Sequence, residues 1–306
     1  MTPKEPVRFL VFGAGATGSV FAARLAARHP VAVVARGERL GQIVRDGIRV
    51  KGATDAAIRP PAAPSAREFA DFRPDYVLVT VKAHSTRAAA PLLEPLGRRP
   101  ARVSLQNGLG NEEALAAGGF PVIGAVSNNG ATLLDSGRVF HAGLGEVILS
   151  GFQAASGDQV EDLAGCLSDA GFPVQRVPDI RKPLWDKTIL NVAVNPVTAL
   201  LGIRTGALLR DPGTELLVRM LVREAVAVAG AEGVTTSEPE VWEMIRRIVA
   251  RTARNKTSML QDLERGVPTE VEAMNGVIVA RGAQHGIETP WNRLMLRLIR
   301  SRERGG

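Results

Sequence analysis

Hydrophobic and polar positions follow two alternating patterns in the first half of the chain. Short apolar runs, rich in β-branched residues, are separated by stretches in which apolar positions recur every three or four residues. The run at 76–81 is apolar almost throughout, as expected for a strand buried on both faces of a parallel sheet. The predicted strands are residues 8–12, 31–35, 76–81, 102–106, 121–126 and 173–177, and the predicted helices are residues 17–28 and 158–170. This alternation predicts an α/β fold with a parallel sheet flanked by helices.

Two further apolar runs, 138–141 and 146–149, are separated by the sequence Ala-Gly-Leu-Gly. We interpret them as a hairpin that extends the same sheet.

The pattern changes near residues 178–183, after which helical periodicity replaces the strands. Four sites carry residues typical of helix starts. They are Asp211-Pro212, Ser237 with Pro239, Thr269 with Glu272 in the arrangement of a capping box, and Thr289-Pro290. We therefore predict two domains, an α/β domain over residues 1–180 and an all-α domain over residues 181–306.

Composition narrows the function classes. A hydrophobic content of 45% excludes wholesale disorder, and no apolar run is long enough to predict a membrane span. Cys166 is the only cysteine, which excludes an internal disulfide and a cysteine-rich zinc site, and we expect no metal. The net charge of +7 invites a nucleic-acid hypothesis, but the arginines are dispersed and aromatic residues make up only 4%. The basic stretch 293–304 is interpreted as the solvated face of a last helix. We expect neither nucleic-acid nor membrane partners.

The N-terminus superficially resembles a signal peptide. Lys4 and Arg8 precede a mostly apolar stretch over residues 9–23. Three glycines at fixed spacing lie inside that stretch, and the pattern continues into a second strand, so we expect a cytoplasmic protein.

Those glycines form the G-x-G-x-x-G pattern between a predicted strand and a predicted helix, which is the context that dinucleotide binding requires. Gly13 permits the tight turn, Gly15 lets a pyrophosphate approach the backbone, and Gly18 allows close packing of helix on strand. The alternative is a glycine-rich turn without a ligand. The predicted cofactor-binding segment consists of Gly13, Ala14, Gly15, Ala16, Thr17 and Gly18.

Arg36 follows the second predicted strand, 18 residues after Gly18. NAD-binding proteins usually carry a carboxylate in this region, which would repel a 2′-phosphate, whereas a guanidinium attracts one. No acidic residue stands at positions 33–37, so we predict NADP(H) over NAD(H). The alternative is a surface arginine in an arginine-rich protein.

Two other polar residues stand at the ends of predicted strands, where ligands of open α/β sheets bind. Lys82 follows the strand 76–81, and Asn107 follows the strand 102–106. A solvated lysine and a simple Asn-Gly turn are the alternatives.

The second half contains a polar stripe in an apolar helix. Lys187, Asn191 and Asn195 are spaced i, i+4 and i+8. On a helix, the first and last of these positions differ by only about 80° around the axis, so the three residues lie on one face. Buried polar groups need partners, either on neighbouring helices or on a ligand. Only six of the 38 cations are lysines, and this one lies among apolar residues, which favours the ligand. Its ammonium could stabilise and protonate the oxygen of a carbonyl that receives a hydride.

Together these residues resemble the ketopantoate reductase (2-dehydropantoate 2-reductase) family over nearly the whole chain. The resemblance implies a Rossmann-type first domain, NADP(H) as cofactor, a small 2-oxo acid as substrate and Lys187 as the catalytic proton donor. It also implies cofactor contacts at Arg36, Lys82, Asn107 and Ala131. Substrate contacts are implied at Asn107, Lys187, Asn191, Asn195 and Ser258. Without the resemblance, Glu270 would be interpreted as an acidic residue in the first turn of a helix. The resemblance implies that it acts at the substrate and the cofactor.

One position departs from the family pattern. Well-known members place another substrate asparagine ten residues after the second helix asparagine, and Thr205 stands here. The expected reaction is reduction of 2-dehydropantoate to (R)-pantoate in a cleft between the domains. The alternatives are the same chemistry on another 2-oxo acid or an imine, and an NADP-sensing or scaffold protein without activity. The amphipathic helices of the second domain are compatible with a homodimer.

Overall fold

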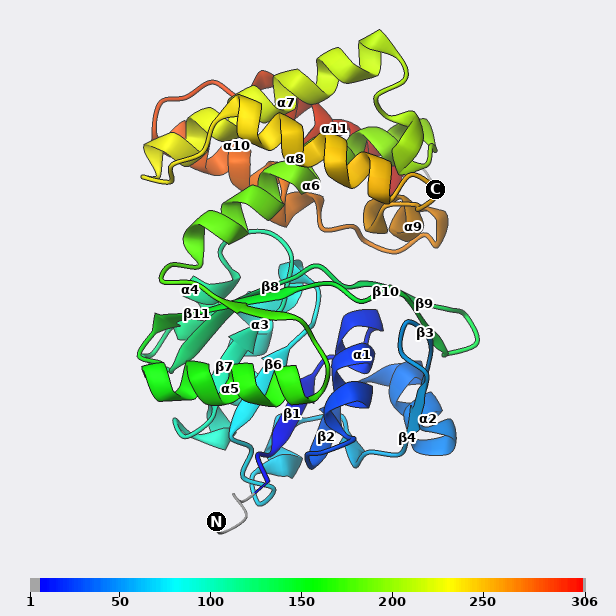
Figure 1. Cartoon of the computed structure of the whole chain (residues 1–306), viewed down its shortest axis with the longest axis vertical. Helices are drawn as coiled ribbons and strands as arrows, with labels where there is room; N and C mark the ends of the chain where they lie inside the picture. The colour runs from blue at the N-terminus through cyan, green and yellow to red at the C-terminus, as the bar shows by residue number, and fades with distance from the viewer. Residues whose placement is uncertain (1–5, 305–306) are drawn as a thin grey trace. The chain divides into compact units, whose positions relative to one another are not determined.

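The computed structural model describes residues 6–304, coloured along the chain in Figure 1. The chain forms two compact units. Of the described residues, the first unit comprises 6–106 and 110–180, and the second comprises 107–109 and 181–304. Each unit is described by itself.

An eight-stranded sheet forms the centre of the first unit, with strand order β12-β11-β8-β7-β6-β1-β2-β5. All neighbouring strands pair in parallel except β8 and β11. The strands are β1 (Phe9–Phe12), β2 (Val31–Val34), β5 (Ala62–Ala63), β6 (Tyr76–Val79), β7 (Ala101–Ser104), β8 (Val122–Ser127), β11 (Val147–Gln153) and β12 (Val174–Arg176). The predicted α/β class with a largely parallel sheet is confirmed.

Alternate residues of the central strand β1 supply two hydrophobic cores, one on each face of the sheet. Phe9 and Val11 pack with apolar residues of helices α1 and α5, while Leu10 and Phe12 pack on the opposite face. The helices of this unit are α1 (Ala16–Leu25), α2 (Gly37–Asp46), α3 (Thr86–Ala89), α4 (Asn111–Ala116) and α5 (Gly157–Asp169), with short 3₁₀ turns η1 (Ala66–Phe69), η2 (Ala83–Ser85) and η3 (Ala90–Leu96).

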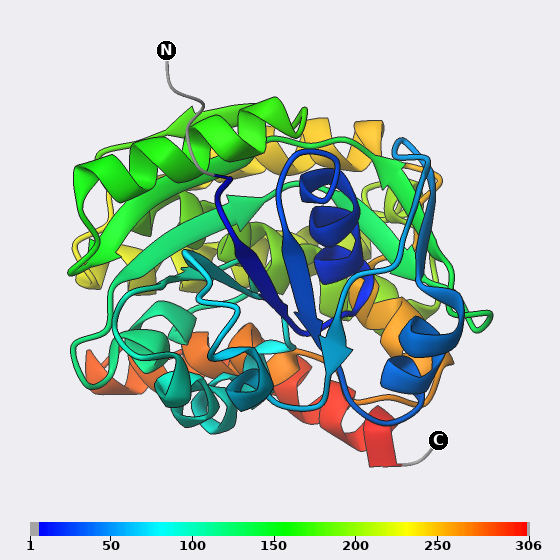
Figure 2. The ribbon, with the colours of Figure 1, turned by 90° about the horizontal axis from the view of Figure 1, so that it is seen from below.

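A second, four-stranded sheet has the order β4-β3-β10-β9. Its strands are β3 (Ile48–Gly52), β4 (Ala56–Ile58), β9 (Gly130–Leu133) and β10 (Val139–Gly143). Helix α1 contacts β1 and β2 on one side and β3, β9 and β10 on the other, so it lies between the two sheets (Figure 2). This explains why α1 is apolar almost all round, with seven of its ten residues buried.

The predicted hairpin of 138–141 and 146–149 is wrong. Strand β10 pairs with β9 and β3, whereas β11 pairs with β8 and β12 in the large sheet. The intervening residues carry the chain from one sheet to the other, and Asn129 holds Gly145 among them. Its side-chain oxygen accepts from the Gly145 N–H at 3.0 Å, and its amide nitrogen donates to the Gly145 carbonyl at 3.1 Å.

The second unit is helical in the part that the structure describes. Its helices are α6 (Arg181–Leu201), α7 (Pro212–Ala231), α8 (Glu238–Arg251), α9 (Ser258–Glu264), α10 (Asn275–Gln284) and α11 (Pro290–Arg304), with 3₁₀ turns η4 (Thr205–Ala207) and η5 (Val271–Ala273). Helix α6 is central and packs against α7, α8, α9 and α11. Among residues 6–304, no helix is both long enough and apolar enough to cross a membrane.

The predicted helix starts have different outcomes. Asp211 caps α7 by accepting from the Thr214 N–H at 2.8 Å, and Ser237 is the N-cap of α8, as predicted. The capping box of Thr269 with Glu272 is wrong. The Thr269 hydroxyl oxygen accepts from the N–H two residues later, the following turn is 3₁₀, and the Glu272 carboxylate is bound by an arginine of α11.

The last helix begins at Pro290 as predicted, but a residue distant in sequence caps it. The Glu224 carboxylate of α7 accepts from the Trp291 N–H at 2.8 Å and from the Asn292 N–H at 2.9 Å. A negative charge at this end also complements the helix dipole.

Candidate active site

The glycine turn of the first unit is held by both neighbouring strands. Gly13 has a φ of +109°, which side chains disfavour, and a Cβ there would lie 2.8 Å from the Val81 backbone nitrogen. Its N–H donates to the Val34 carbonyl at 3.0 Å, and its carbonyl accepts from the Thr80 hydroxyl at 2.5 Å. The turn between β1 and α1 is therefore fixed in place by β2 and β6.

Gly15 and Gly18 differ in what surrounds them. A Cβ on Gly18 would lie 2.1 Å from the Gly13 carbonyl oxygen, so this glycine is required by packing within the protein. A Cβ on Gly15 would meet nothing within 4 Å. Gly15 is the N-cap of α1 and has no side chain to accept from the first-turn N–H groups, which are the groups that bind a phosphate.

A cavity of about 490 Å³ lies over this turn. Four predicted cofactor residues line it, Gly13, Ala14, Gly15 and Arg36. Arg36 is exposed, and its Nε lies 3.5 Å from the Pro64 carbonyl oxygen. The open space, the glycine backbone and a guanidinium together fit a dinucleotide.

Arg39 also lines the cavity, and sequence reasoning missed it. Its guanidinium donates to the Ala14 carbonyl at 2.8 Å, to the Ser19 hydroxyl at 2.9 Å and to the Gly137 carbonyl at 2.7 Å. Burial lowers the pKa of this arginine. Arg39 therefore braces the glycine turn from α2, one helical turn from Arg36. In a chain with 32 arginines, nothing in the sequence distinguished it.

The other predicted cofactor residues do not line this cavity. Ala16, Thr17 and Gly18 continue into the first turn of α1. Lys82 follows β6 immediately before η2 and is partly exposed. Ala131 lies on β9, pairs with His141 of β10 and packs against the hydrophobic core.

Three predicted residues come together in the second unit. Burial lowers the pKa of Lys187 from its ordinary 10.5 to about 8, and the negative charge of Glu270 partly opposes that fall. The Glu270 carboxylate in turn accepts from the Asn107 side-chain amide at 3.1 Å. An ammonium of lowered pKa beside a hydrogen-bonded carboxylate can act as a general acid near neutral pH.

Asn107 belongs to this unit because residues 107–109 pack against η5. Gly108 has a φ of +82°, and a Cβ there would lie 2.2 Å from the Ala273 carbonyl oxygen. The same oxygen accepts from the Leu109 N–H at 3.4 Å. The predicted Asn-Gly turn is thus a docking point that orients the amide of Asn107 toward Glu270.

The two helix asparagines occupy different environments. Asn191 is partly exposed, whereas Asn195 is 6% exposed and its amide nitrogen lies 3.7 Å from the Met274 sulfur. A thioether is a weak acceptor, so this contact uses little of the hydrogen-bonding capacity of the amide. The contact with the Met274 sulfur therefore accounts only weakly for the buried amide of Asn195.

Ser258 and Thr205 differ in their exposure. Ser258 is the first residue of α9 and is exposed. Thr205 is 3% exposed, and its hydroxyl and its N–H both donate to the Asn255 carbonyl, at 3.1 and 3.0 Å. The residue that departs from the family pattern is thus already engaged within the protein. Within residues 6–304, no group of three His, Cys, Asp or Glu side chains could hold a metal ion.

Comparison with known proteins identifies the family of this chain. Residues 9–153 match the family model for ketopantoate reductase PanE/ApbA, and residues 179–303 match the model for its C-terminal part. A 2-dehydropantoate 2-reductase from Archaeoglobus fulgidus is 37% identical over 302 residues, covering 97% of this chain and 98% of that protein.

Solved structures extend the likeness to the fold. A PanE/ApbA family ketopantoate reductase from Ralstonia eutropha is 33% identical with a TM-score of 0.89, covering 98% of this chain and 99% of that one. D-Mandelate dehydrogenase with NADH and anilino(oxo)acetate has a TM-score of 0.91 at 22% identity, covering 98% and 99% of the two chains. At that identity the likeness concerns the fold alone. The two matching family models and the Archaeoglobus relative show that this chain is an oxidoreductase of the ketopantoate reductase family.

Proposed function

We propose that this protein reduces 2-dehydropantoate to (R)-pantoate with NADPH and that Lys187 donates the proton. The observation that carries the proposal is the partly buried Lys187 ammonium of α6, whose pKa burial lowers to about 8 and on which the Glu270 carboxylate acts. The names of the full-length relatives supply the substrate.

Lys187 performs the step that the protein itself must supply. Reduction of a ketone builds negative charge on the carbonyl oxygen, and a positioned ammonium stabilises that charge and then transfers its proton. A lysine with an ordinary pKa would hold its proton too tightly at neutral pH, and burial lowers that pKa. The charge of Glu270 limits the fall of the pKa, so that the amine stays protonated before the reaction.

The residues around the first-unit cavity fit NADP(H). When bound, the reduced nicotinamide supplies the hydride. The first-turn N–H groups of α1 would bind the pyrophosphate over Gly15, and the Arg36 guanidinium would bind the 2′-phosphate. Lys82, Asn107 and Ala131 are proposed as further cofactor contacts, on the family resemblance.

The substrate is an anionic 2-oxo acid, and its oxygens need donors. Asn191, Asn195 and Asn107 carry amides that donate without adding charge, and Ser258 would add a hydroxyl. Because Asn107 already donates to Glu270, we propose that these two residues orient the substrate together.

A different 2-oxo acid is the second candidate, and Thr205 favours it. The Thr205 hydroxyl is committed to the Asn255 carbonyl, so it offers a ligand less than the asparagine of well-known family members. A substrate with fewer polar groups than 2-dehydropantoate would need no donor at this position.

The deciding experiment is an assay of cofactor oxidation with a panel of 2-oxo acids, each with NADPH and with NADH. We expect the highest kcat/KM with 2-dehydropantoate and NADPH. A higher kcat/KM with another oxo acid would identify that acid, and not 2-dehydropantoate, as the substrate. Absence of turnover with every oxo acid, together with tight NADPH binding, would favour a cofactor-sensing protein.

A further inference from the structure

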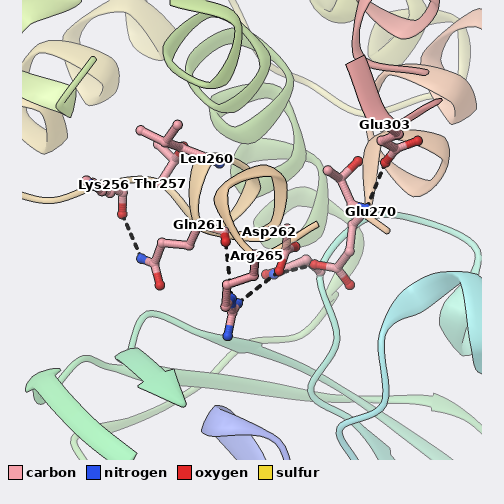
Figure 3. A network of polar contacts seen from close by, with 10 residues as sticks. Lys256, Thr257, Leu260, Gln261, Asp262, Arg265, Glu270 and Glu303 are labelled. Atoms are coloured by element: carbon pink, nitrogen blue, oxygen red, sulfur yellow. Dashed lines mark hydrogen bonds and ion pairs between the residues drawn. The ribbon is translucent and has the colours of Figure 1, made fainter. Parts of the chain in front are cut away.

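The short segment that carries Glu270 is anchored on both sides by the last turn of α11. The Thr269 N–H donates to the Glu303 carboxylate at 2.8 Å (Figure 3). On the other side, Arg300 binds the Glu272 carboxylate through two nitrogens, with Nη2 to Oε2 at 2.7 Å. Glu270 lies between the two anchored residues, together with Val271.

The two anchors match in spacing. Arg300 and Glu303 lie three residues apart and therefore share one face of α11. Thr269 and Glu272 are also three residues apart. Within the segment, the Ala273 N–H donates to the Glu270 carbonyl at 3.0 Å, which closes the turn η5. The segment is thus tied to one helix, α11, on either side of Glu270.

The position of this turn matters because of what Glu270 contacts. Its carboxylate accepts from the Asn107 amide, and its charge acts on the Lys187 ammonium. The neighbouring charge on α6, Asp186, is paired with Lys182 at 3.0 Å. Glu270 is therefore the carboxylate that sets the charge balance at Lys187.

We propose that Glu303 and Arg300 are positioning residues, which hold the turn 269–272 so that the Glu270 carboxylate stays beside Lys187 and Asn107. Neither residue needs to touch the substrate or the cofactor. The importance of these two residues for catalysis rests on the proposed function, in which Lys187 is the proton donor. Their hold on the turn does not depend on which substrate is reduced.

The test follows the Lys187 amine directly. The protein is labelled with lysine carrying ¹³C at Cε, and the pH titration of each signal is recorded by NMR. Because the chain has six lysines, the Lys187 signal is assigned by its loss in Lys187→Met. In Glu303→Ala the turn loses an anchor and Glu270 moves away, so the pKa of Lys187 should fall by about half a unit or more. Glu270→Gln gives the full effect of removing the carboxylate.

Two variants separate positioning from charge. Glu303→Gln removes the charge but keeps an oxygen that accepts from Thr269, so Lys187 should titrate as in the unchanged protein. Glu264→Ala removes an exposed carboxylate of α9 that pairs with Lys256, and should also leave Lys187 unchanged. If Glu303→Ala fails to fold, Arg300→Ala removes the other anchor and should lower the pKa in the same direction.

The proposal is wrong if Lys187 titrates at the same pH in the anchor variant and the unchanged protein. It is also wrong if Glu303→Gln or Glu264→Ala produces the same fall as Glu303→Ala. Because the titration needs no substrate, a protein inactive on 2-dehydropantoate could still pass it. With an active substrate, the basic limb of the kcat/KM profile should move to lower pH with the Lys187 pKa.

Discussion

The side-chain amide of Asn275 donates a hydrogen bond to the backbone carbonyl of Val192, 3.2 Å away. Pro196 lies four residues after Val192 in α6 and has no N–H, so this carbonyl lacks its usual α-helical donor. Asn275 is fully buried at the start of α10, and the same amide nitrogen donates to Asn292 at 2.9 Å. A side chain 83 residues away therefore repairs the break in the helix that carries Lys187.

We predict that Asn275→Ala destabilises the protein through this carbonyl. The change leaves a buried acceptor without a donor and opens a small void, which together should cost about 2–3 kcal/mol of unfolding free energy. Urea unfolding monitored by circular dichroism measures the loss.

A double-mutant cycle isolates the relationship. Pro196→Ala restores an N–H that can satisfy the Val192 carbonyl, so Asn275→Ala should cost about 1 kcal/mol less in that background. Equal costs in both backgrounds would show that Asn275 acts through Asn292 alone.

The glycines of the dinucleotide turn should separate folding from binding. Gly18→Ala places a methyl group against the Gly13 carbonyl oxygen and should lower the melting temperature strongly. Gly15→Ala meets nothing in the protein and should leave the melting temperature within a few degrees. It should nevertheless weaken cofactor binding about tenfold or more, because the methyl group occupies the space that a pyrophosphate would take. Calorimetric titration with NADPH checks this. Unchanged affinity in Gly15→Ala would place the cofactor elsewhere.

Arg36 and Arg39 should differ in how they affect cofactor choice. Arg36→Ala removes the proposed 2′-phosphate partner, so the KM for NADPH should rise about tenfold or more while the KM for NADH changes little. Arg39→Ala releases the Ala14 carbonyl and so disturbs the turn itself. It should therefore raise both KM values by similar factors. Steady-state kinetics with each cofactor distinguish the two roles, and an equal effect of Arg36→Ala on both cofactors would refute its selectivity.

The sequence predicted features whose cause is local. The G-x-G-x-x-G turn, the central strands and the caps at Asp211 and Ser237 follow from residue type and spacing, and each lies close to where it was expected. The buried strand β6 was recognisable because both of its faces are covered, although it ends at Val79 and not at residue 81 as predicted.

Features with a distant cause were missed. Strands β3, β4 and β9 are short, and they are held in the second sheet by contacts with α1 that no local pattern reveals. Thr269 looked like a helix cap, but an acceptor 34 residues away binds its N–H. The brace formed by Arg39 depends on Gly137, 98 residues further along the chain. The polar stripe pointed to Lys187, but its partner Glu270 was known only through the family resemblance.

Lys187 should limit stability as well as supply the proton. Its pKa is about 8 in the folded protein and about 10.4 in the unfolded chain, so the unfolded state binds more protons between these values. The cost of burying the ammonium is therefore present in full below pH 8 and is relieved as the pH rises toward 10.4. Lys187→Met removes this cost, and at pH 7 we expect it to raise the free energy of unfolding by about 1–2 kcal/mol.

The same substitution should abolish most of the activity. Loss of a general acid costs about 10²–10⁴-fold in turnover, while NADPH affinity, measured by calorimetry, should be unchanged. In the unchanged protein, kcat/KM for reduction should fall above pH 8, where the ammonium loses its proton, and the rate of the reverse oxidation should rise over the same range, because it needs the neutral amine. A reverse rate that fell in parallel with the forward rate would mean that a group other than Lys187 transfers the proton. A variant that is more stable, binds the cofactor and does not turn over cannot owe its inactivity to unfolding.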